Sequence, residues 1–236
     1  MKKLFYILSL LLICQFAKAQ VTGRVDTIIT PDASNKALVE FKIRWPDGKT
    51  HIIGKMLNEK KEGVWRSYTN RSIIETIREY HEGKLNGVSF HFSENGTLDQ
   101  EENYKNDVLN GERNIYLYGS VIKGQENFVD GKLDGDRRLY YESGKMQEHA
   151  NFKNGIRDGV TTWYTQDEKP TIEYTYKMGE LEGLAKFYNN GILQSEGMYH
   201  NGNEEGDWKV YEDDALLKTV TYKEGKVVKE VAAKKK

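Results

Sequence analysis

Residues 87–104 read Gly-Val-Ser-Phe-His-Phe-Ser-Glu-Asn-Gly-Thr-Leu-Asp-Gln-Glu-Glu-Asn-Tyr, and this stretch contains the pattern that decides the fold. Two short runs flank the pair Asn95-Gly96, and an Asn-Gly pair between such runs is the strongest short signal for a β-hairpin. Equivalent turn pairs occur at Asp47-Gly48, Ser143-Gly144 and Asn190-Gly191. The stretch therefore predicts two antiparallel strands joined by a tight turn.

The hairpin pattern recurs about every 24 residues along the chain. Each unit starts at an opening glycine: Gly63, Gly87, Gly111, Gly135, Gly159, Gly183 and Gly206. Five residues later stands an opening aromatic: Tyr68, Phe92, Tyr116, Tyr140, Tyr164, Tyr188 and Tyr211. A closing aromatic ends each unit: Tyr80, Tyr104, Phe128, Phe152, Tyr176, Tyr199 and Tyr222. A fixed period of this length is typical of repeat proteins, in which each unit buries its apolar face against its neighbours.

The units are too short to hold crossover helices, so the repeats predict an all-β, antiparallel meander of hairpins. A degenerate unit begins near Val39, which gives about eight units over residues 39–229. Sixteen strands set side by side would form an elongated array roughly 75 Å long. We divide the chain into a signal peptide (1–19), an N-terminal segment (20–38), the repeat domain (39–229) and a basic tail (230–236).

The second strand of each unit alternates apolar and polar residues. The sixth position before the closing aromatic is mostly apolar: Ile74, Leu98, Ile122, Met146, Pro170, Leu193 and Leu216. Six is an even number, so we expect these side chains to share a face with the closing aromatics, and successive aromatics to stack between units. Buried repeat positions must be apolar for folding, which favours the aromatic columns as core over a surface for sugars or peptides.

Two units show a family resemblance most clearly, Phe128-Val-Asp-Gly-Lys-Leu-Asp-Gly135 and Tyr176-Lys-Met-Gly-Glu-Leu-Glu-Gly183. The recurrent Tyr/Phe-x-x-Gly-x-x-x-Gly pattern resembles the MORN repeat, and more closely the bacterial MORN-repeat variant found in YwqK-type antitoxins. The resemblance implies an elongated β-hairpin array that acts as a binding or scaffolding surface, in some members towards membranes. It implies no catalytic residues.

The N-terminus has the form of an export signal. Lys2 and Lys3 precede an apolar run over residues 4–13, and Ala17-Lys18-Ala19 forms a small-x-small cleavage site. We expect cleavage between Ala19 and Gln20, and a protein exported to the periplasm, the cell envelope or the medium. Lipidation at Cys14 is the less favoured alternative, because the preceding residue is not small.

Composition and motifs exclude several functions. The 236 residues carry 35 basic and 36 acidic side chains, so bulk charge does not direct the chain to nucleic acid. A single cysteine excludes a disulfide scaffold and a cysteine zinc site. Because no phosphate loop, His-Glu-x-x-His motif or nucleophile elbow occurs, we expect no catalytic residue, metal site or cofactor. His81 and His200 occupy the same turn position and are expected to be exposed.

These observations favour an exported, non-enzymatic repeat protein that binds or scaffolds an unidentified protein partner or an envelope component. One alternative is an antitoxin-like or immunity-like protein that neutralises a partner, and another is a cell-wall carbohydrate-binding repeat protein. The lysines of the tail, Lys234 to Lys236, could add weak attraction to an anionic membrane or cell wall. The oligomeric state stays open, since an open sheet offers two edges for pairing.

Overall fold

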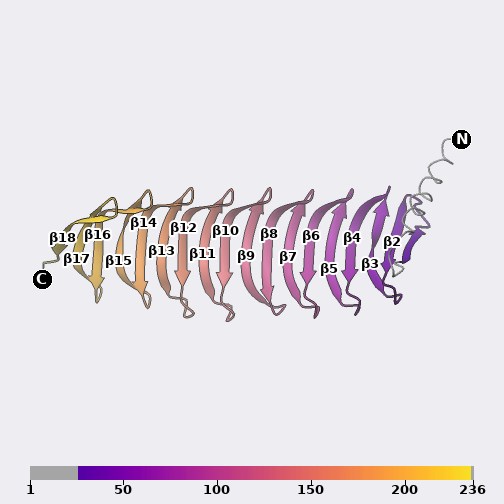
Figure 1. Cartoon of the computed structure of the whole chain (residues 1–236), viewed down its shortest axis with the longest axis horizontal. Coiled ribbons are helices and arrows are strands. Elements are labelled where there is room, and N and C mark those ends of the chain that lie inside the picture. Colours follow the sequence, from indigo (N-terminus) through magenta and orange to yellow (C-terminus); the bar gives the residue numbers. More distant parts are fainter. Residues whose placement is uncertain (1–25, 235–236) are drawn as a thin grey trace.

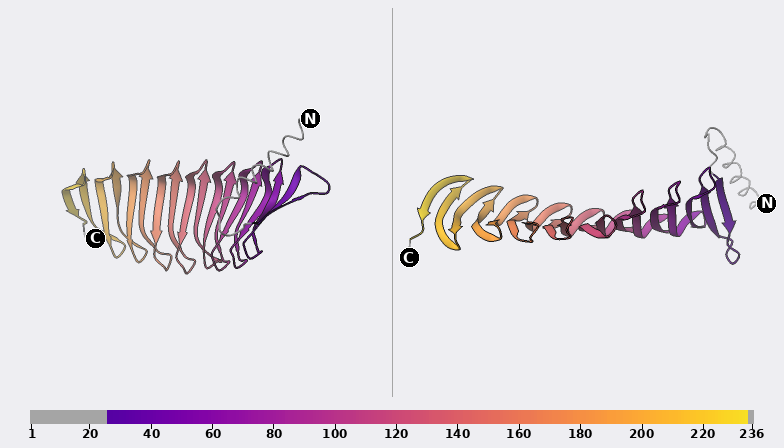
Figure 2. Two further views of the ribbon diagram at one scale, coloured as in Figure 1. Left: turned by 45° about the vertical axis from the view of Figure 1, so that its right-hand side comes forward. Right: turned by 90° about the horizontal axis from the view of Figure 1, so that it is seen from below.

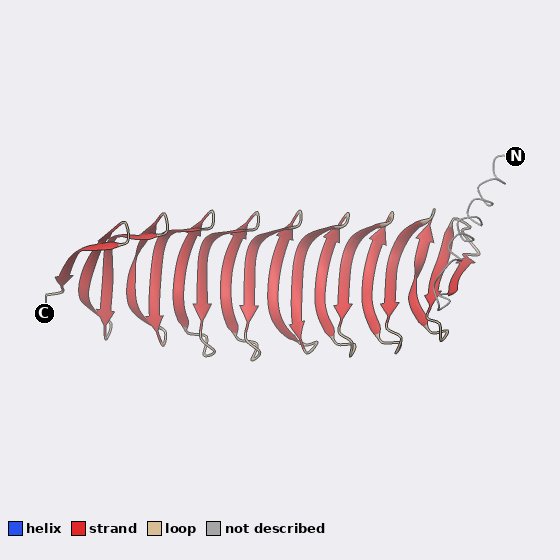
Figure 3. Ribbon diagram, viewed as in Figure 1, coloured by secondary structure: helices blue, strands red, loops and turns tan. Residues whose placement is uncertain are grey.

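The computed structural model describes residues 26–234, which form strands and turns and no helix (Figure 3). The strands are β1 (Asp26–Pro31), β2 (Leu38–Arg44), β3 (Thr50–Leu57), β4 (Lys60–Tyr68), β5 (Ile74–His81), β6 (Lys84–Phe92), β7 (Leu98–Lys105), β8 (Val108–Leu117), β9 (Val121–Val129), β10 (Lys132–Tyr140), β11 (Met146–Lys153), β12 (Ile156–Tyr164), β13 (Pro170–Lys177), β14 (Glu180–Asn189), β15 (Ile192–His200), β16 (Asn203–Glu212), β17 (Ala215–Lys223) and β18 (Lys226–Ala232). Across this part of the chain no helix is long and apolar enough to cross a membrane.

Every strand pairs antiparallel with the next strand along the chain, from β1 to β18. The result is one open, twisted sheet that extends along a single axis (Figures 1 and 2). The prediction of an elongated, all-β array of antiparallel hairpins is confirmed. Because each strand contacts only its neighbours, the described strands form no central core, and side chains on each face pack only along the sheet.

The sheet is longer at both ends than the sequence pattern indicated. The structure has 18 strands instead of sixteen. β1 lies within the segment 20–38 and pairs with β2, although it carries neither an opening glycine nor an aromatic column. β18 continues to Ala232, so the sheet includes the first residues of the predicted tail. The predicted signal peptide, with Cys14, Ala19 and Gln20, lies outside the described residues.

Two kinds of turn follow one another along the chain, so each long edge of the sheet carries one kind. Successive units are joined by two-residue turns such as Asn154-Gly155, with φ of 53° and 85°, the geometry of a type I′ hairpin turn. The Gly155 N–H donates to the Leu133 carbonyl of the preceding unit at 2.7 Å. Within a unit the hairpin loop is longer: at Asn95-Gly96 it spans 93–97, and only the glycine has a positive φ, of 80°.

Each opening glycine lies at an irregularity of the ladder. The pairing of β9 with β10 shifts register between Leu133 and Arg137, and Gly135 lies inside that shift with φ of 102°. Beside it, the Asn127 side-chain amide donates to the Asp136 carbonyl at 3.2 Å. Asn103 and Asn151 make the same bond one unit earlier and one unit later, at 2.8 and 3.1 Å. The repeat therefore needs glycine here because the backbone conformation is one that side chains rarely adopt.

The two faces of the sheet carry different aromatic columns. We call the side that bears the closing aromatics the closing-aromatic face, and the other side the opening-aromatic face. Most buried side chains lie on the closing-aromatic face: Trp65, Ser89, Glu126, Glu148, Ala150, Thr161, Ala185, Trp208 and Val220. The opening aromatics point the other way; the Tyr116 hydroxyl, for example, donates to Glu101, whose neighbour Glu102 lies on the closing-aromatic face.

The prediction for the sixth-position residues is wrong. In β5 the register passes from Ser67–Thr76 to Tyr68–Ile74, which leaves Glu75 as one extra residue. Ser67 contacts the side chains of both Glu75 and Thr76, at 3.1 and 2.7 Å, so these two neighbours point to the same side. The bulge reverses the alternation beyond it, and Ile74 therefore lies with Tyr68 on the opening-aromatic face.

Closing aromatics contact rings of other columns instead of stacking on one another. They stand on every second strand, about 10 Å apart, so a side chain of the intervening strand separates them. Tyr80 packs against Trp65 with ring centroids 6.2 Å apart, and Tyr199 packs against Trp208 at 5.4 Å. The expected stacking of successive closing aromatics is therefore wrong, and the ring contacts between units involve other columns.

Candidate binding surface

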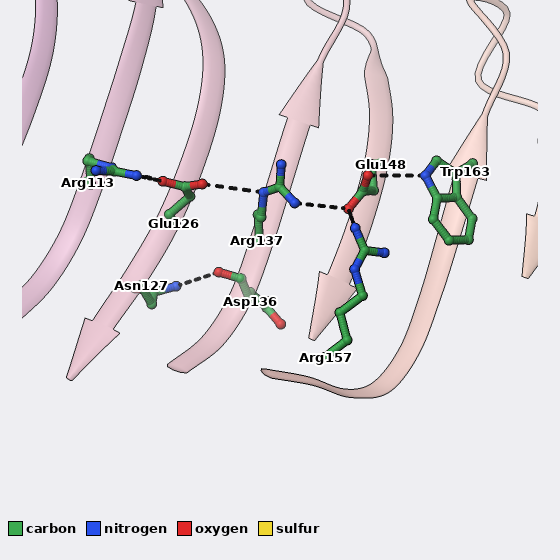
Figure 4. Close-up of polar contacts among 8 residues, drawn as sticks. All are labelled: Arg113, Glu126, Asn127, Asp136, Arg137, Glu148, Arg157 and Trp163. Carbon is green, nitrogen blue, oxygen red and sulfur yellow. Dashed lines mark hydrogen bonds and ion pairs between the residues drawn. The ribbon is translucent and has the colours of Figure 1, made fainter. Parts of the chain in front are cut away.

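Five alternating charges cross the middle of the closing-aromatic face. Arg113 of β8, Glu126 of β9, Arg137 of β10, Glu148 of β11 and Arg157 of β12 lie side by side (Figure 4). Each glutamate lies between two arginines. Glu126 accepts from Arg113 at 2.5 Å and has Arg137 Nε at 3.3 Å, while Glu148 has Arg137 Nη1 at 3.4 Å and Arg157 Nη2 at 2.8 Å. We call these five residues the charge ladder.

The carboxylates of the ladder are the buried members. Glu126 and Glu148 are only 8% and 7% exposed, whereas the side chains of the three arginines are about a quarter exposed. A buried carboxylate needs compensating partners, and two guanidinium groups supply them for each glutamate. Glu148 also accepts from the Trp163 indole N–H at 3.1 Å. The two glutamates of the ladder are therefore compensated by ion pairs, although Arg137 Nε is buried without a hydrogen bond. The three arginines remain partly exposed to solvent.

The closing aromatics support the arginines. The Arg113 guanidinium lies 4.7 Å from the Phe128 ring centroid, and Arg137 and Arg157 lie 5.8 and 5.4 Å from that of Phe152. Such contacts between a cation and a ring hold the planar guanidinium in place. The middle of this face thus combines a fixed row of charges with an aromatic support.

Both ends of the same face are aromatic. At the N-terminal end, Trp65 contacts Phe41 at 5.6 Å and also Tyr80. At the C-terminal end, Trp208 packs between Tyr199 and Tyr222. Burial, with a smaller contribution from Tyr174, raises the pKa of Tyr199 to about 12, so this phenol stays neutral at physiological pH.

The opening-aromatic face has a regular pattern of its own. Tyrosine hydroxyls donate to polar groups on the adjacent, preceding strand: Tyr116 to Glu101, Tyr140 to Gln125 and Tyr211 to Glu196. Burial and the bond to Glu101 raise the pKa of Tyr116. Unlike the ladder arginines, each of these tyrosines directs its hydroxyl to the preceding unit of the sheet.

A family model described as a MORN repeat variant matches residues 85–106, 133–154 and 181–201. Each matched stretch coincides with one complete unit, made of an opening strand, its hairpin loop and a closing strand. The chain carries MORN-variant repeats. The units between the matched stretches share the same columns of opening glycines, opening aromatics and closing aromatics. No curated protein sequence matches the chain significantly.

The connecting turns of the MORN units carry the two histidines that share a position. His81 Nδ1 lies 3.0 Å from Glu62, and His200 Nδ1 lies 2.9 Å from Glu182, in both cases a carboxylate of the preceding strand pair. Their side chains are 63% and 61% exposed, as expected from the sequence. Glu62 also accepts from the Glu82 backbone N–H, and Glu182 from that of Asn201. These acids cap the next turn, so the histidine contacts belong to the structure of the array.

The sequence interpretation did not identify the charge ladder. It treated carboxylates such as Glu75, Asp99, Glu101 and Glu173 as a solvated face, and Glu173 indeed pairs with the partly exposed Lys186 at 3.6 Å. The sequence does contain a signal for the charge ladder, because an even spacing from a repeat column places a residue on a known face of the strand. Glu126 stands two residues before a closing aromatic and Arg137 two residues after an opening glycine, so both lie on the closing-aromatic face.

Proposed function

We propose that the protein is an exported, non-enzymatic array whose closing-aromatic face binds an extended protein partner or envelope component. The charge ladder is the observation that carries this proposal. Its glutamates are neutralised within the protein, but its arginines have five N–H donors each and are partly exposed. They recur with the two-strand spacing of the sheet, about 10 Å, which suits a partner that lies along the array.

Fixed arginines and aromatic rings are the side chains that dominate binding energy in protein interfaces. Here the closing aromatics and the neighbouring glutamates already hold the guanidinium groups, so binding orders fewer side chains. MORN-variant repeats occupy residues 85–106, 133–154 and 181–201 of the sheet, and repeat arrays act through extended surfaces. These features support binding over catalysis.

A photo-crosslinking experiment tests which face binds. A photoreactive residue is placed at Gln100, beside the ladder on the closing-aromatic face, and in a matched chain at Val160, which is 41% exposed on the opening-aromatic face. We expect a discrete crosslinked species from position 100 in living cells and none from position 160. Equal crosslinking from both faces, or none from position 100, contradicts the proposal.

The export step is tested separately. The intact mass of the protein from its native host should correspond to a chain that begins at Gln20, in the exported fraction. A mass that corresponds to a chain beginning at lipidated Cys14 would mean that the exported protein is tethered to the membrane and is not soluble. An uncleaved chain inside the cell contradicts export and favours the antitoxin alternative, in which the same face covers a toxin.

A further inference from the structure

A hollow of about 350 Å³ opens on the closing-aromatic face near its N-terminal end. Trp65 and Tyr80 contribute ring walls, and Ser67 and Thr76 contribute hydroxyl groups that lie 2.7 Å from each other. At the position of Ser67, later units place Leu139 and Trp163. The small side chain of this unit therefore leaves a space that the later units fill.

The hollow is rich in cationic side chains. Lys61, Arg66 and Arg78 line it, and the imidazole rings of His51 and His91 also lie in the lining. The Lys61 ammonium lies 4.7 Å from the Trp65 ring centroid and 4.6 Å from that of Tyr80, so the two rings hold it at the wall. The only carboxylate in the lining is Glu75, which already accepts a bond from Ser67.

Lys61 and Arg78 differ from the arginines of the charge ladder. Arg157 occupies the repeat position of Lys61, two residues before an opening glycine, and Glu148 neutralises it at 2.8 Å. Within residues 26–234, by contrast, no carboxylate lies within 4.0 Å of the cationic groups of Lys61 or Arg78. Arg78 is also exposed, although its strand neighbours Ile77 and Tyr80 are partly buried. Lys61 and Arg78 therefore have no ion-pair partner in the described part of the protein, and the single carboxylate of the lining, Glu75, leaves the hollow with an excess of positive charge.

We propose that this hollow binds one acidic sugar residue through its carboxylate. Arg78 and Lys61 supply the opposite charge, and the planar guanidinium of Arg78 matches a carboxylate in a two-bond geometry. The Ser67 hydroxyl donates to Glu75, so the Thr76 hydroxyl donates to Ser67, and the remaining lone pairs of these oxygens can accept from ring hydroxyls. The space suits a single ring. This site is separate from the charge ladder and does not depend on the ladder binding a partner.

Titration of the purified protein with sodium glucuronate tests the site, with heat release and Trp fluorescence as readouts. We expect saturable binding of glucuronate that weakens as salt rises. Glucose, which lacks the carboxylate, should bind at least about tenfold more weakly, because a charged hydrogen bond accounts for about that factor. Inorganic phosphate tests whether charge alone is enough, and we expect it to bind more weakly than glucuronate.

Arg78→Gln is the decisive variant, because this exposed side chain makes no ion pair within the described sheet. We expect it to weaken glucuronate binding at least about tenfold. Lys61→Gln should act in the same direction, and its thermal melt shows whether the loss of contact with Trp65 disturbs folding. Lys132→Gln, at an exposed position three units along, is the control and should leave binding unchanged.

The proposal is overturned by no binding of glucuronate, by equal binding of glucose, or by glucuronate binding that is unchanged in Arg78→Gln. Phosphate that binds as tightly as glucuronate also overturns it, because the hollow would then recognise charge without a sugar ring.

Discussion

At the residue scale, the opening glycines divide into two groups that the repeat alone does not distinguish. Gly159 has φ of 112°, and a Cβ there would meet Asn151 at 3.2 Å. Gly206 has φ of 72°, an ordinary left-handed value, and a Cβ there would meet nothing within 4 Å. The strand that precedes Gly159 places Asn151 beside it, whereas the strand that precedes Gly206 carries Met198 at the corresponding position.

Substitution by alanine should separate these two groups. We expect Gly206→Ala to lower the free energy of unfolding by about 1 kcal/mol, the usual cost of a left-handed conformation for a side chain. Gly159→Ala should cost about 2–3 kcal/mol, because the conformation is strained further and the new methyl group presses on Asn151. Urea denaturation of both variants measures the difference, and equal losses would show that the asparagine contact has no role.

The His81–Glu62 contact makes a pH-dependent contribution. The hydrogen bond and the charge of Glu62 raise the pKa of His81 above its ordinary value of 6.5. A raised pKa means that the folded state binds the proton more tightly than the unfolded state. The resulting stability is complete below pH 6.5 and is lost as the pH rises through the pKa of the folded state.

An NMR titration of the His81 ring checks this sign. We expect a midpoint above 6.5 in the native protein and a lower midpoint in Glu62→Gln. Glu94→Gln, which changes a distant acid, should leave the midpoint unchanged. A midpoint that does not respond to Glu62→Gln would mean that the exposed pair does not persist in solution.

At the element scale, β10 allows the two faces of one strand to be compared through neighbouring residues. Arg137 lies between the buried Glu126 and Glu148, whereas Arg138 points to the other face and pairs with the half-exposed Asp136. Removal of a cation from between buried carboxylates leaves them less compensated, while exposed pairs contribute little.

We expect Arg137→Met to lower the free energy of unfolding by about 2 kcal/mol, since Arg113 and Arg157 still compensate part of the charge. Arg138→Met should change it by less than about 0.5 kcal/mol. Chemical denaturation of the two single variants gives both values. Equal effects would contradict the view that the charge ladder, and not its exposed neighbours, holds the middle of the sheet together.

The elements themselves were largely predictable, and the errors have definite causes. The period of opening glycines and aromatics predicted the hairpins because each column recurs at a fixed place in a strand or turn. The face of Ile74 was wrong because a β-bulge adds a residue without changing the sequence period. β1 was missed because it carries no repeat column that marks it as a strand.

The candidate site was less predictable than the elements. Pairing of Arg113 with Glu126 depends on the register between β8 and β9, in which the two residues are opposite each other. A sequence period gives the position of a residue within its unit but not the residue across from it. The hollow depends on a small Ser67 where other units have larger side chains, a difference that becomes visible only when the columns are aligned by unit.

At the scale of the whole molecule, the central claim is that the chain forms one open sheet extended along a single axis, with two distinct faces. Eighteen strands at about 4.8 Å per strand give a length of roughly 80 Å along the sheet. Both proposals require this form, because an array folded back on itself would cover one of the faces.

Small-angle X-ray scattering of the purified protein tests this claim most directly. A compact globule of this length would have a radius of gyration of about 17 Å. The extended sheet predicts roughly 25 Å and a longest dimension of roughly 80 Å, from the strand spacing. A radius near about 17 Å with a symmetric distance distribution would contradict the open array, and with it the account of both faces.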